Sequence, residues 1–554
     1  MAHPSKSAWP KPCATCEAAI TSVIDGIGID DEPASIVIVG GGPHALAALS
    51  ALHEGRLEDV GGPEANVCVI DPGTHFMQSW NARFDALQID HLRSPAFTHP
   101  VAFEPTALLD FAKCEGRTQE LIERPGGGDW VPTTDLSEQA TLLKARPSHS
   151  LFRDFCASLE AKLCHRWLSG TAHQVCKDQS TGKFRVHFTA TADGRERRVV
   201  ARAVILATGP VSKWNVPTPF APHLGASPLI LHTEALLTNS TCTLSEQIAR
   251  RCPEESARVL VIGGGISAAQ AALAACRAGH QVVLRSRRPL QTKDFDTGSE
   301  WLDVRTGARL RFEFLCLPMV RRRELIRAAT PGGSVPATYM AELLALSKRT
   351  TSLQLEVDAD IDRSNVHIGG DGKRISVNGE SFAMVILATG VVTSPACSEL
   401  YQSIQGQFGA PTVDGLPRVD SRLRWLPGED IFVMGANAML ELGPGGGNLM
   451  GAMRGARTVS NELRSLMQAP STQPSLSRSV FFNMYASLGD RHRFGDGSES
   501  EIDALAQLLH LSPQAEAALR KAKKDRKATR GLKGERAPLA ALHMDARTSR
   551  AAYW

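Results

Sequence analysis

Short runs of β-branched and other apolar residues alternate along the chain with stretches of small residues. Residues 35–39 form the first such run and predict a buried parallel strand. The run ends in the three glycines of residues 40–42, and residues 43–49 continue as a small, apolar helix. A second run, residues 258–262, is followed by the glycines of residues 263–265 and by another helix of small residues. The pattern therefore predicts the same strand–turn–helix unit twice.

The residues of the first turn match the requirements of a dinucleotide site. Gly40 permits the sharp turn from strand to helix, and Gly42 lets the backbone approach a pyrophosphate. Ala45 stands in the third position of the G-x-G-x-x-G/A pattern, where a small residue lets the helix pack on the strand. The helix N-terminus, which includes Pro43 and His44, offers unpaired N–H groups and a partial positive charge to phosphate.

The ends of the next strands distinguish the two sites. Residues 67–71 predict a strand that ends in Asp71, whose carboxylate suits free ribose hydroxyls. The interval from Gly42 to Asp71 is lengthened by a polar loop over residues 55–66. The corresponding strand of the second unit, residues 281–284, is followed by a basic group: Arg285, Ser286, Arg287 and Arg288.

Guanidinium groups bind a 2′-phosphate, which a carboxylate would repel. The first site therefore suits a cofactor with free ribose hydroxyls, and the second suits NADPH. The alternative is that the basic group is a solvated turn. The predicted NADPH site comprises Gly263, Gly265, Ile266, Ser267, Arg285, Arg287 and Arg288.

Two buried strands end in the same small residues. Residues 151–167 have helical spacing, strands follow at 184–188 and 199–206, and the latter runs into Ala-Thr-Gly. The strand at 384–387 runs into Ala-Thr-Gly as well. Small residues at the carboxyl end of a strand let a cofactor or a crossing chain come close. We therefore place at the cofactors Thr208, Gly209, Thr389 and Gly390.

Candidate chemistry lies after the first unit and inside the second. Trp80, His91 and Arg93 follow the first unit, where a flavin ring would be lined if that site holds FAD. In the alternative, Trp80 belongs to the core and His91 is a satisfied loop histidine. Residues 100–149 predict a cap or a surface loop. Residues 292–342 could close over nicotinamide or define the substrate, or form a solvated insertion.

Composition limits the remaining function classes. The 554 residues are 43% hydrophobic with a net charge of +3, which argues against a nucleic-acid-binding body. No apolar run approaches the ~18–20 residues that span a bilayer, and the N-terminus lacks the apolar core of a secretory signal. The twelve cysteines are scattered and mostly lie in apolar segments, as expected in a reducing compartment. We predict a cytoplasmic protein with no metal site.

The two ends of the chain differ from its body. Residues 1–33 are expected to be flexible, and their Cys13 and Cys16 pair lacks the second pair that a zinc site needs. Residues 502–519 predict amphipathic helices, and residues 520–536 hold nine basic and two acidic residues. The basic run is most simply a solvated tail; an acidic partner or a nuclear address for it, and an organellar address for the N-terminus, are alternatives.

The order of these parts over residues 34–465 resembles flavoproteins with two dinucleotide-binding domains. More narrowly it resembles NADPH-dependent flavin monooxygenases, including the lysine/ornithine N-hydroxylases and the Baeyer–Villiger group. Residues 40–45 and 263–268 carry the resemblance, with Ala-Thr-Gly after each. Residues 431–437 resemble the last strand of the FAD domain, and residues 445–450 open a helix whose N-terminus, by resemblance, lies at the flavin pyrimidine. The resemblance thus adds to the FAD site Asn437, Gly447, Asn448 and Leu449.

The family fingerprints are matched only in part. The Baeyer–Villiger pattern is loosely echoed by Phe220, Gly225 and His232, which makes His232 a candidate catalytic residue beside His91 and Arg93. Where the N-hydroxylases end their last motif with Asp and Tyr, this chain has Ala383 and Val391. No substrate can be transferred from the family on these residues.

The resemblance implies an α/β fold with two Rossmann-like domains, in which the NADPH domain is inserted into a discontinuous FAD domain. The expected parts are residues 34–255 and 379–469 for FAD, 256–378 for NADPH, and 470–554 for a helical basic tail. It also implies that NADPH reduces the flavin and that one oxygen atom of O2 passes to a small nitrogen, sulfur or carbonyl substrate. Alternatives are a disulfide reductase, an NADPH oxidase or dehydrogenase without oxygen transfer, and a regulatory FAD-binding protein without turnover. The oligomeric state stays open.

Overall fold

The computed structural model describes residues 34–54, 66–122, 142–210, 212–237, 242–295, 297–302, 304–330, 332–370, 372–393 and 395–467, which belong to one compact unit. The predicted flexible segment at 1–33 with its cysteine pair, most of the polar loop at 55–66, and the basic tail at 470–554 lie outside the described residues.

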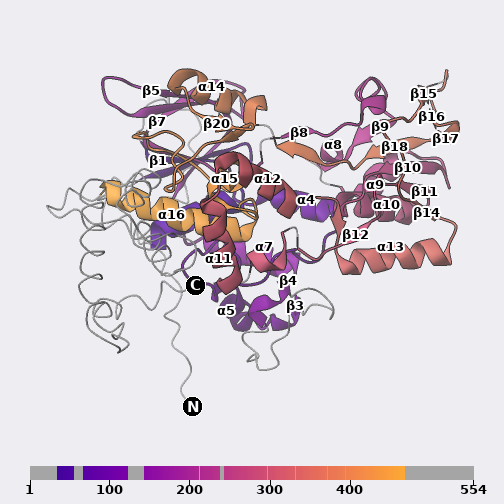
Figure 1. Cartoon of the computed structure of the whole chain (residues 1–554), viewed down its shortest axis with the longest axis horizontal. Helices are drawn as coiled ribbons and strands as arrows, with labels where there is room; N and C mark the ends of the chain where they lie inside the picture. The colour runs from indigo at the N-terminus through magenta and orange to yellow at the C-terminus, as the bar shows by residue number, and fades with distance from the viewer. Residues whose placement is uncertain are drawn as a thin grey trace, which may run out of the picture. The chain divides into compact units, whose positions relative to one another are not determined.

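The first glycine turn follows the central strand of a sheet whose middle is parallel (Figure 1). Strand β1 (Ala34–Val39) lies between β2 (Val67–Asp71) and β7 (Glu196–Leu206), and all three run parallel. The sheet continues through β5 (Arg166–Lys177) on one side and β22 (Ile431–Val433) on the other. The residues of β1 are almost completely buried, as the β-branched run predicts for a central parallel strand.

Strands β5 and β7 extend beyond the parallel part of this sheet. The first residues of β5 pair with β2, and its second half pairs antiparallel with β6 (Phe184–Ala190). Strand β6 then pairs antiparallel with the first half of β7. Helix α7 (His149–Glu160) ends before β5 begins, so the helix expected over residues 151–167 is too long by several residues.

The second glycine turn lies at a separate, entirely parallel sheet. Its order is β14 (Leu353–Glu356), β11 (Gln281–Arg285), β10 (Arg258–Ile262), β18 (Met384–Leu387) and β9 (Ile230–His232). Strands β9 and β18 lie outside the segment 256–378 expected for the NADPH domain, so the second sheet draws on residues at both of its sides.

Two small antiparallel sheets adjoin these sheets along the chain. A three-stranded antiparallel sheet of β15 (Val366–Ile368), β16 (Ile375–Val377) and β17 (Glu380–Phe382) precedes β18. Strands β8 (Ser212–Trp214) and β19 (Val391–Thr393) pair antiparallel where the chain leaves one sheet for the other and where it returns.

The same backbone contact closes both glycine turns. The Ala207 amide donates to the Val39 carbonyl (2.9 Å), and the Ala388 amide donates to the carbonyl of Ile262 (2.8 Å). A Cβ on Gly40 would lie 2.4 Å from the Ala207 oxygen, and one on Gly263 would lie 2.2 Å from the Ala388 oxygen. Only glycine fits at either position, because a side chain would overlap backbone there.

Helices cover the sheets. Helix α2 (Pro43–Glu54) packs on α16 (Leu449–Met467), and α10 (Ile266–Arg277) packs on α9 (Leu244–Arg251) and α13 (Ala337–Arg349). The remaining helices and strands are α4 (Gln78–Leu87), α5 (Ala107–Cys114), α8 (Thr233–Leu237), α14 (Glu399–Phe408), β3 (Leu121–Ile122), β4 (Arg146–Pro147), β12 (Gln291–Thr292), β13 (Ser334–Val335), β20 (Thr412–Val413) and β21 (Leu416–Pro417). Within the described part of the chain, none of the helices has the length and apolar character to cross a membrane.

The insertion after β11 is packed rather than solvated. It contains α11 (Val304–Leu315) and α12 (Met319–Ala329), and α12 lies against α15 (Met439–Leu442) in Figure 1. Phe314 and Ile326 of the insertion are buried with Leu440 in one apolar cluster. The insertion of the second sheet therefore packs on the last segment of the first.

Candidate functional site

Asp71 organises the first glycine turn. Its two carboxylate oxygens accept hydrogen bonds from the amides of Gly41 (2.7 Å) and Gly73 (2.8 Å). A Cβ on Gly41 would clash with Asp71 and Trp167, whereas a Cβ on Gly42 would meet nothing within 4 Å. The turn is thus tight on the side of β2 and open at Gly42, where a pyrophosphate needs room.

His44 connects the start of α2 with the start of α16. Its Nε2 donates to the Gly447 carbonyl (3.2 Å), and the side chain is buried. Burial lowers the pKa of His44 to about 4, so the ring is neutral at pH 7 and Nδ1 is an acceptor. Nδ1 is buried and has no hydrogen-bond partner among the described residues. An orphaned acceptor beside the turn fits a ligand that supplies a hydroxyl or N–H donor.

The Ala-Thr-Gly end of β7 is held by two buried side chains. The Tyr401 hydroxyl lies 3.2 Å from Thr208 Oγ1, and Asn437 Nδ2 donates to the carbonyl of Gly209 (3.0 Å) and to Tyr401 (2.9 Å). Burial raises the pKa of Tyr401 to about 12, so its hydroxyl stays protonated. Asn437 Oδ1 is a second buried acceptor with no partner in the described part of the chain. The sequence places Thr208, Gly209 and Asn437 at FAD, but no pattern points to Tyr401.

The start of α16 completes this site. Asn448 Oδ1 accepts from the Gly451 amide (3.1 Å), which satisfies one of the free N–H groups in the first helical turn of α16. A Cβ on Gly447 would lie 3.2 Å from Ala436, and Leu449 is buried. The open turn and the two orphaned acceptors together fit FAD, held by the first glycine turn, Asp71, His44, Asn437 and the start of α16.

The second turn has a different lining. A Cβ on Gly265 would lie 3.3 Å from the Cα of Gly333, so the insertion passes over this turn, which leads into Ile266 and Ser267. Arg287 and Arg288 are exposed, and Arg287 lies 3.4 Å from Asp362. Both guanidinium groups are therefore accessible to a 2′-phosphate.

Arg285 has other partners than the sequence suggests. Its Nε lies 2.6 Å from Glu356 and its second terminal nitrogen lies 2.8 Å from Glu380, while the side chain is only 7% exposed. Glu356 lies on the adjacent strand β14 and Glu380 on β17, so Arg285 has a structural role that the sequence does not predict, and its cofactor contact stays a prediction.

His232 lies at the connection between the two sheets. Nε2 donates to the Gly390 carbonyl (3.1 Å), Nδ1 accepts from the Glu234 amide (3.2 Å), and the ring stacks on Trp214 at 5.2 Å. Asn215 bonds both Thr389 and Gly390. Burial lowers the pKa of His232, so the neutral ring supports the second Ala-Thr-Gly end. Both ring nitrogens are used there, which leaves none for a substrate.

His91 and Trp80 both follow β2 in the chain, in different surroundings. His91 forms a β-bridge with Ser148, and burial followed by the charge of Arg146 lowers its pKa. Trp80 stacks on Phe84 (4.9 Å between centroids) and packs on the first core, with its Nε1 buried and unpartnered among the described residues. Trp80 therefore has the packing of a core residue together with one free donor.

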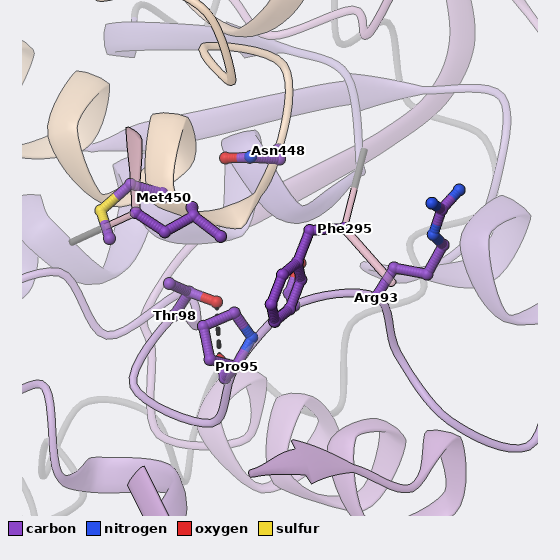
Figure 2. A pocket seen from close by; sticks show the side chains of 8 residues that line it. Arg93, Pro95, Thr98, Phe295, Asn448 and Met450 are labelled. Atoms are coloured by element: carbon purple, nitrogen blue, oxygen red, sulfur yellow. Dashed lines mark hydrogen bonds between the residues drawn. The ribbon is translucent and has the colours of Figure 1, made fainter. Parts of the chain in front are cut away.

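Arg93 joins the first unit to the insertion. It donates to the carbonyls of Lys293 (2.8 Å) and Asp294 (3.0 Å) and to Ser334 Oγ (3.0 Å). A small pocket is formed at this junction, which Figure 2 shows. Its lining residues come from the segment after β2, from the insertion and from the start of α16: Arg93, Ser94, Pro95, Thr98, Phe295, Leu302, Asn448 and Met450.

Two Rossmann-like sheets, each with a glycine turn at the end of its central strand, define the fold of a two-dinucleotide-domain flavoprotein, an FAD- and NAD(P)-dependent oxidoreductase. Comparisons with known families agree with this class. Residues 37–211 match an FAD-NAD(P)-binding family, and residues 135–303 match the pyridine nucleotide-disulphide oxidoreductases. A search of curated proteins finds no match.

Solved structures with the same fold include several N-hydroxylating enzymes. Ornithine hydroxylase from Pseudomonas aeruginosa has a TM-score of 0.58 and 17% identity, with 79% of this chain and 100% of that chain covered. The cadaverine monooxygenase of desferrioxamine biosynthesis from Erwinia amylovora has a TM-score of 0.57 and 17% identity, with 80% and 98% covered. The ornithine N-hydroxylase of Kutzneria sp. 744 has a TM-score of 0.57 and 16% identity, with 78% and 100% covered. At these identities the likeness shows the fold.

Gly42→Ala separates cofactor binding from folding. The added methyl group meets no protein atom within 4 Å, so the FAD-free variant should melt within about 1 °C of the wild type. We expect its FAD affinity to fall at least about tenfold, because the methyl group occupies space that the pyrophosphate needs. Thermal melts and FAD titration measure the two effects. Gly406→Ala, also free of neighbours within 4 Å, is the matched control and should bind FAD normally. Unchanged FAD affinity in Gly42→Ala would contradict the assignment of the turn.

The buried histidines predict acid sensitivity of the FAD-free protein. The pKa values of His44 and His99 are both lowered to about 4 by burial, so between pH 6.5 and 4 the unfolded chain binds protons that the folded chain does not. Neither histidine lowers the free energy of unfolding above pH 6.5, and each lowers it by about 3 kcal/mol as the pH drops to 4. Urea unfolding across this range should show a shallower pH slope for His44→Gln than for the wild type. Equal slopes would mean that His44 is not a buried neutral base.

Proposed function

We propose that this chain is an FAD- and NADPH-dependent monooxygenase that transfers one oxygen atom of O2 to a small nitrogen, sulfur or carbonyl substrate. The observation that carries the proposal is the pocket. Its lining comes from the segment after β2, from the insertion after β11 and from the start of α16. FAD, when bound, supplies the hydride acceptance and the oxygen chemistry.

The chain's own residues would bind, orient and exclude water. Asp71, the first glycine turn and the start of α16 bind FAD, and Arg93 fixes the insertion by three hydrogen bonds to residues 293, 294 and 334. Phe295 and Met450 give the pocket apolar walls, and Asn448 gives it a polar one. Apolar walls suit oxygen transfer, because a site that excludes water protects reactive intermediates from side reactions.

A disulfide reductase with this fold needs a redox-active cysteine pair beside the flavin. Nine cysteines in the described residues are free thiols, and none of them lines the pocket. Cys164 is disulfide-bonded, and its carbonyl accepts from His53. His53 lies at the far end of α2 from the glycine turn, about 15 Å along the helix. The cysteine positions therefore favour oxygen transfer over disulfide reduction.

Isotope transfer tests the reaction. The FAD-loaded protein, given NADPH, 18O2 and a panel of amines, thioethers and ketones, should form at least one product with a single 18O atom, detected by mass spectrometry. Gly42→Ala, prepared without FAD, is the control and should form none. Peroxide release in place of every labelled product would replace the monooxygenase with an NADPH oxidase.

Substitution of Arg288 tests the choice of nucleotide. We expect Arg288→Ala to raise the KM for NADPH by about 10–100-fold and to leave the KM for NADH unchanged, because one charge-assisted contact to the 2′-phosphate is lost. Arg363→Ala, an exposed arginine that follows the same sheet, should change neither value. Arg285→Met should instead destabilise the fold by about 2 kcal/mol, since Glu356 loses its arginine and Glu380 keeps only Arg258. Equal effects of Arg288→Ala on both nucleotides would contradict the proposed NADPH preference.

A further inference from the structure

An arginine cluster lies behind the pocket, between α11, α12 and α16. Arg311 belongs to α11, Arg322 to α12, and Arg454 and Arg457 to α16. Glu441 of α15 is the acidic residue that faces this cluster, and its charge acts on both Arg311 and Arg322. The insertion and the last helix thus bring several positive charges together in the interior.

Two of these arginines already have partners. Arg322 lies 3.1 Å from Glu441, both side chains are only 11% exposed, and Arg322 also donates to the carbonyls of Leu315, Leu317 and Leu440. Arg457 donates to the carbonyl of Ala102, and the charge of Glu54 acts on it. The carboxylate of Glu441 is therefore engaged by Arg322, and Glu54 serves Arg457.

Arg311 and Arg454 have no such pairing among the residues that the structure describes. Arg311 makes no hydrogen bond or salt bridge there, and its Nε is buried and unsatisfied. Arg454 makes one long hydrogen bond to the Trp301 carbonyl (3.5 Å). Burial and the nearby charges of Arg311 and Arg457 lower the pKa of Arg454 to about 9, and burial lowers that of Arg311. Both side chains are only partly buried, and Glu441 is the acidic residue whose charge reaches Arg311. Two neighbouring guanidinium groups that form no salt bridge in the described residues suit an anion.

This pair adjoins the pocket. Arg454 follows Met450 by four residues and lies on the same face of α16, about 6 Å further along the helix. Its hydrogen-bond partner Trp301 precedes Leu302, which also lines the pocket. Arg454 therefore lies one helical turn from a residue that lines the pocket.

We propose that Arg311 and Arg454 bind an anionic group of the substrate, a carboxylate or a phosphate ester, and so hold its reacting nitrogen or sulfur at the pocket. This inference rests on the proposed monooxygenase function and adds the substrate class. Guanidinium forks match both anions, and the same two charges repel a second cationic group. The site thus selects against diamines such as the cadaverine named for the enzyme from Erwinia amylovora.

Ligand binding to the FAD-loaded protein tests the site without turnover. The probes are ω-(methylthio)alkanoates from propionate to hexanoate, their primary amides, 2-(methylthio)ethyl phosphate and cadaverine, followed by the flavin difference spectrum and by thermal shift. At least one carboxylate or the phosphate ester should bind, its uncharged counterpart should bind at least about tenfold more weakly, and cadaverine should not bind. Whether carboxylates or the phosphate ester bind better identifies the anion.

Charge removal provides the matched comparison. Arg454→Met and Arg311→Met should weaken anion binding by about a hundredfold. Arg321→Met, at an exposed ion pair of α12, should leave binding unchanged. In the ligand-free protein, Arg454→Met should raise the melting temperature by about 1–2 °C, because one of several neighbouring positive charges is removed, whereas a purely structural arginine would lower it.

The outcomes separate this site from the reaction. Failure of every anion to bind, equal binding of amides, binding of cadaverine, or unchanged binding by both arginine variants would overturn the site. Arginine-dependent anion binding without 18O in any product would leave the site standing and overturn the monooxygenase. Oxygen transfer to uncharged amines at equal rates in wild type and Arg454→Met would leave the monooxygenase standing and overturn the site.

Discussion

The contact between a glycine and a strand-end carbonyl is the constraint on which both nucleotide sites depend. At Gly40 and at Gly263 the backbone of the neighbouring Ala-Thr-Gly segment lies where a Cβ would be. The contact aligns the carboxyl ends of two adjacent parallel strands, and helices α2 and α10 start beside it, where a dinucleotide phosphate is expected. The same architecture recurs in one chain because the same backbone contact recurs.

The two sheets are joined by more than the β8–β19 pair. Arg93 reaches from the first unit to the insertion, and α12 of the insertion packs on α15 of the last segment. These contacts place the pocket where all three parts meet. One helical turn from the pocket-lining Met450 lies Arg454, which together with Arg311 is proposed to hold an anion.

Much of the fold could be predicted from local pattern. The strands of residues 34–39 and 258–262, both turns, Asp71 and the two Ala-Thr-Gly ends follow from apolar runs and from glycines at fixed intervals. Strand β5 could not be predicted, because most of its residues are only partly buried and it lacks a long apolar run. Tyr401, the partners of Arg285 and the arginine pair depend on contacts between segments up to 193 residues apart, which no local spacing encodes.

The central claim is that the two turns hold different nucleotides close enough for a hydride to pass between them. Its most direct test is stopped-flow absorbance of the FAD-loaded protein mixed with NADPH in the absence of oxygen. The account predicts that the yellow flavin bleaches in a single turnover and that transfer from deuterated NADPH is slower. A protein that binds FAD and NADPH together but keeps its yellow colour would contradict it.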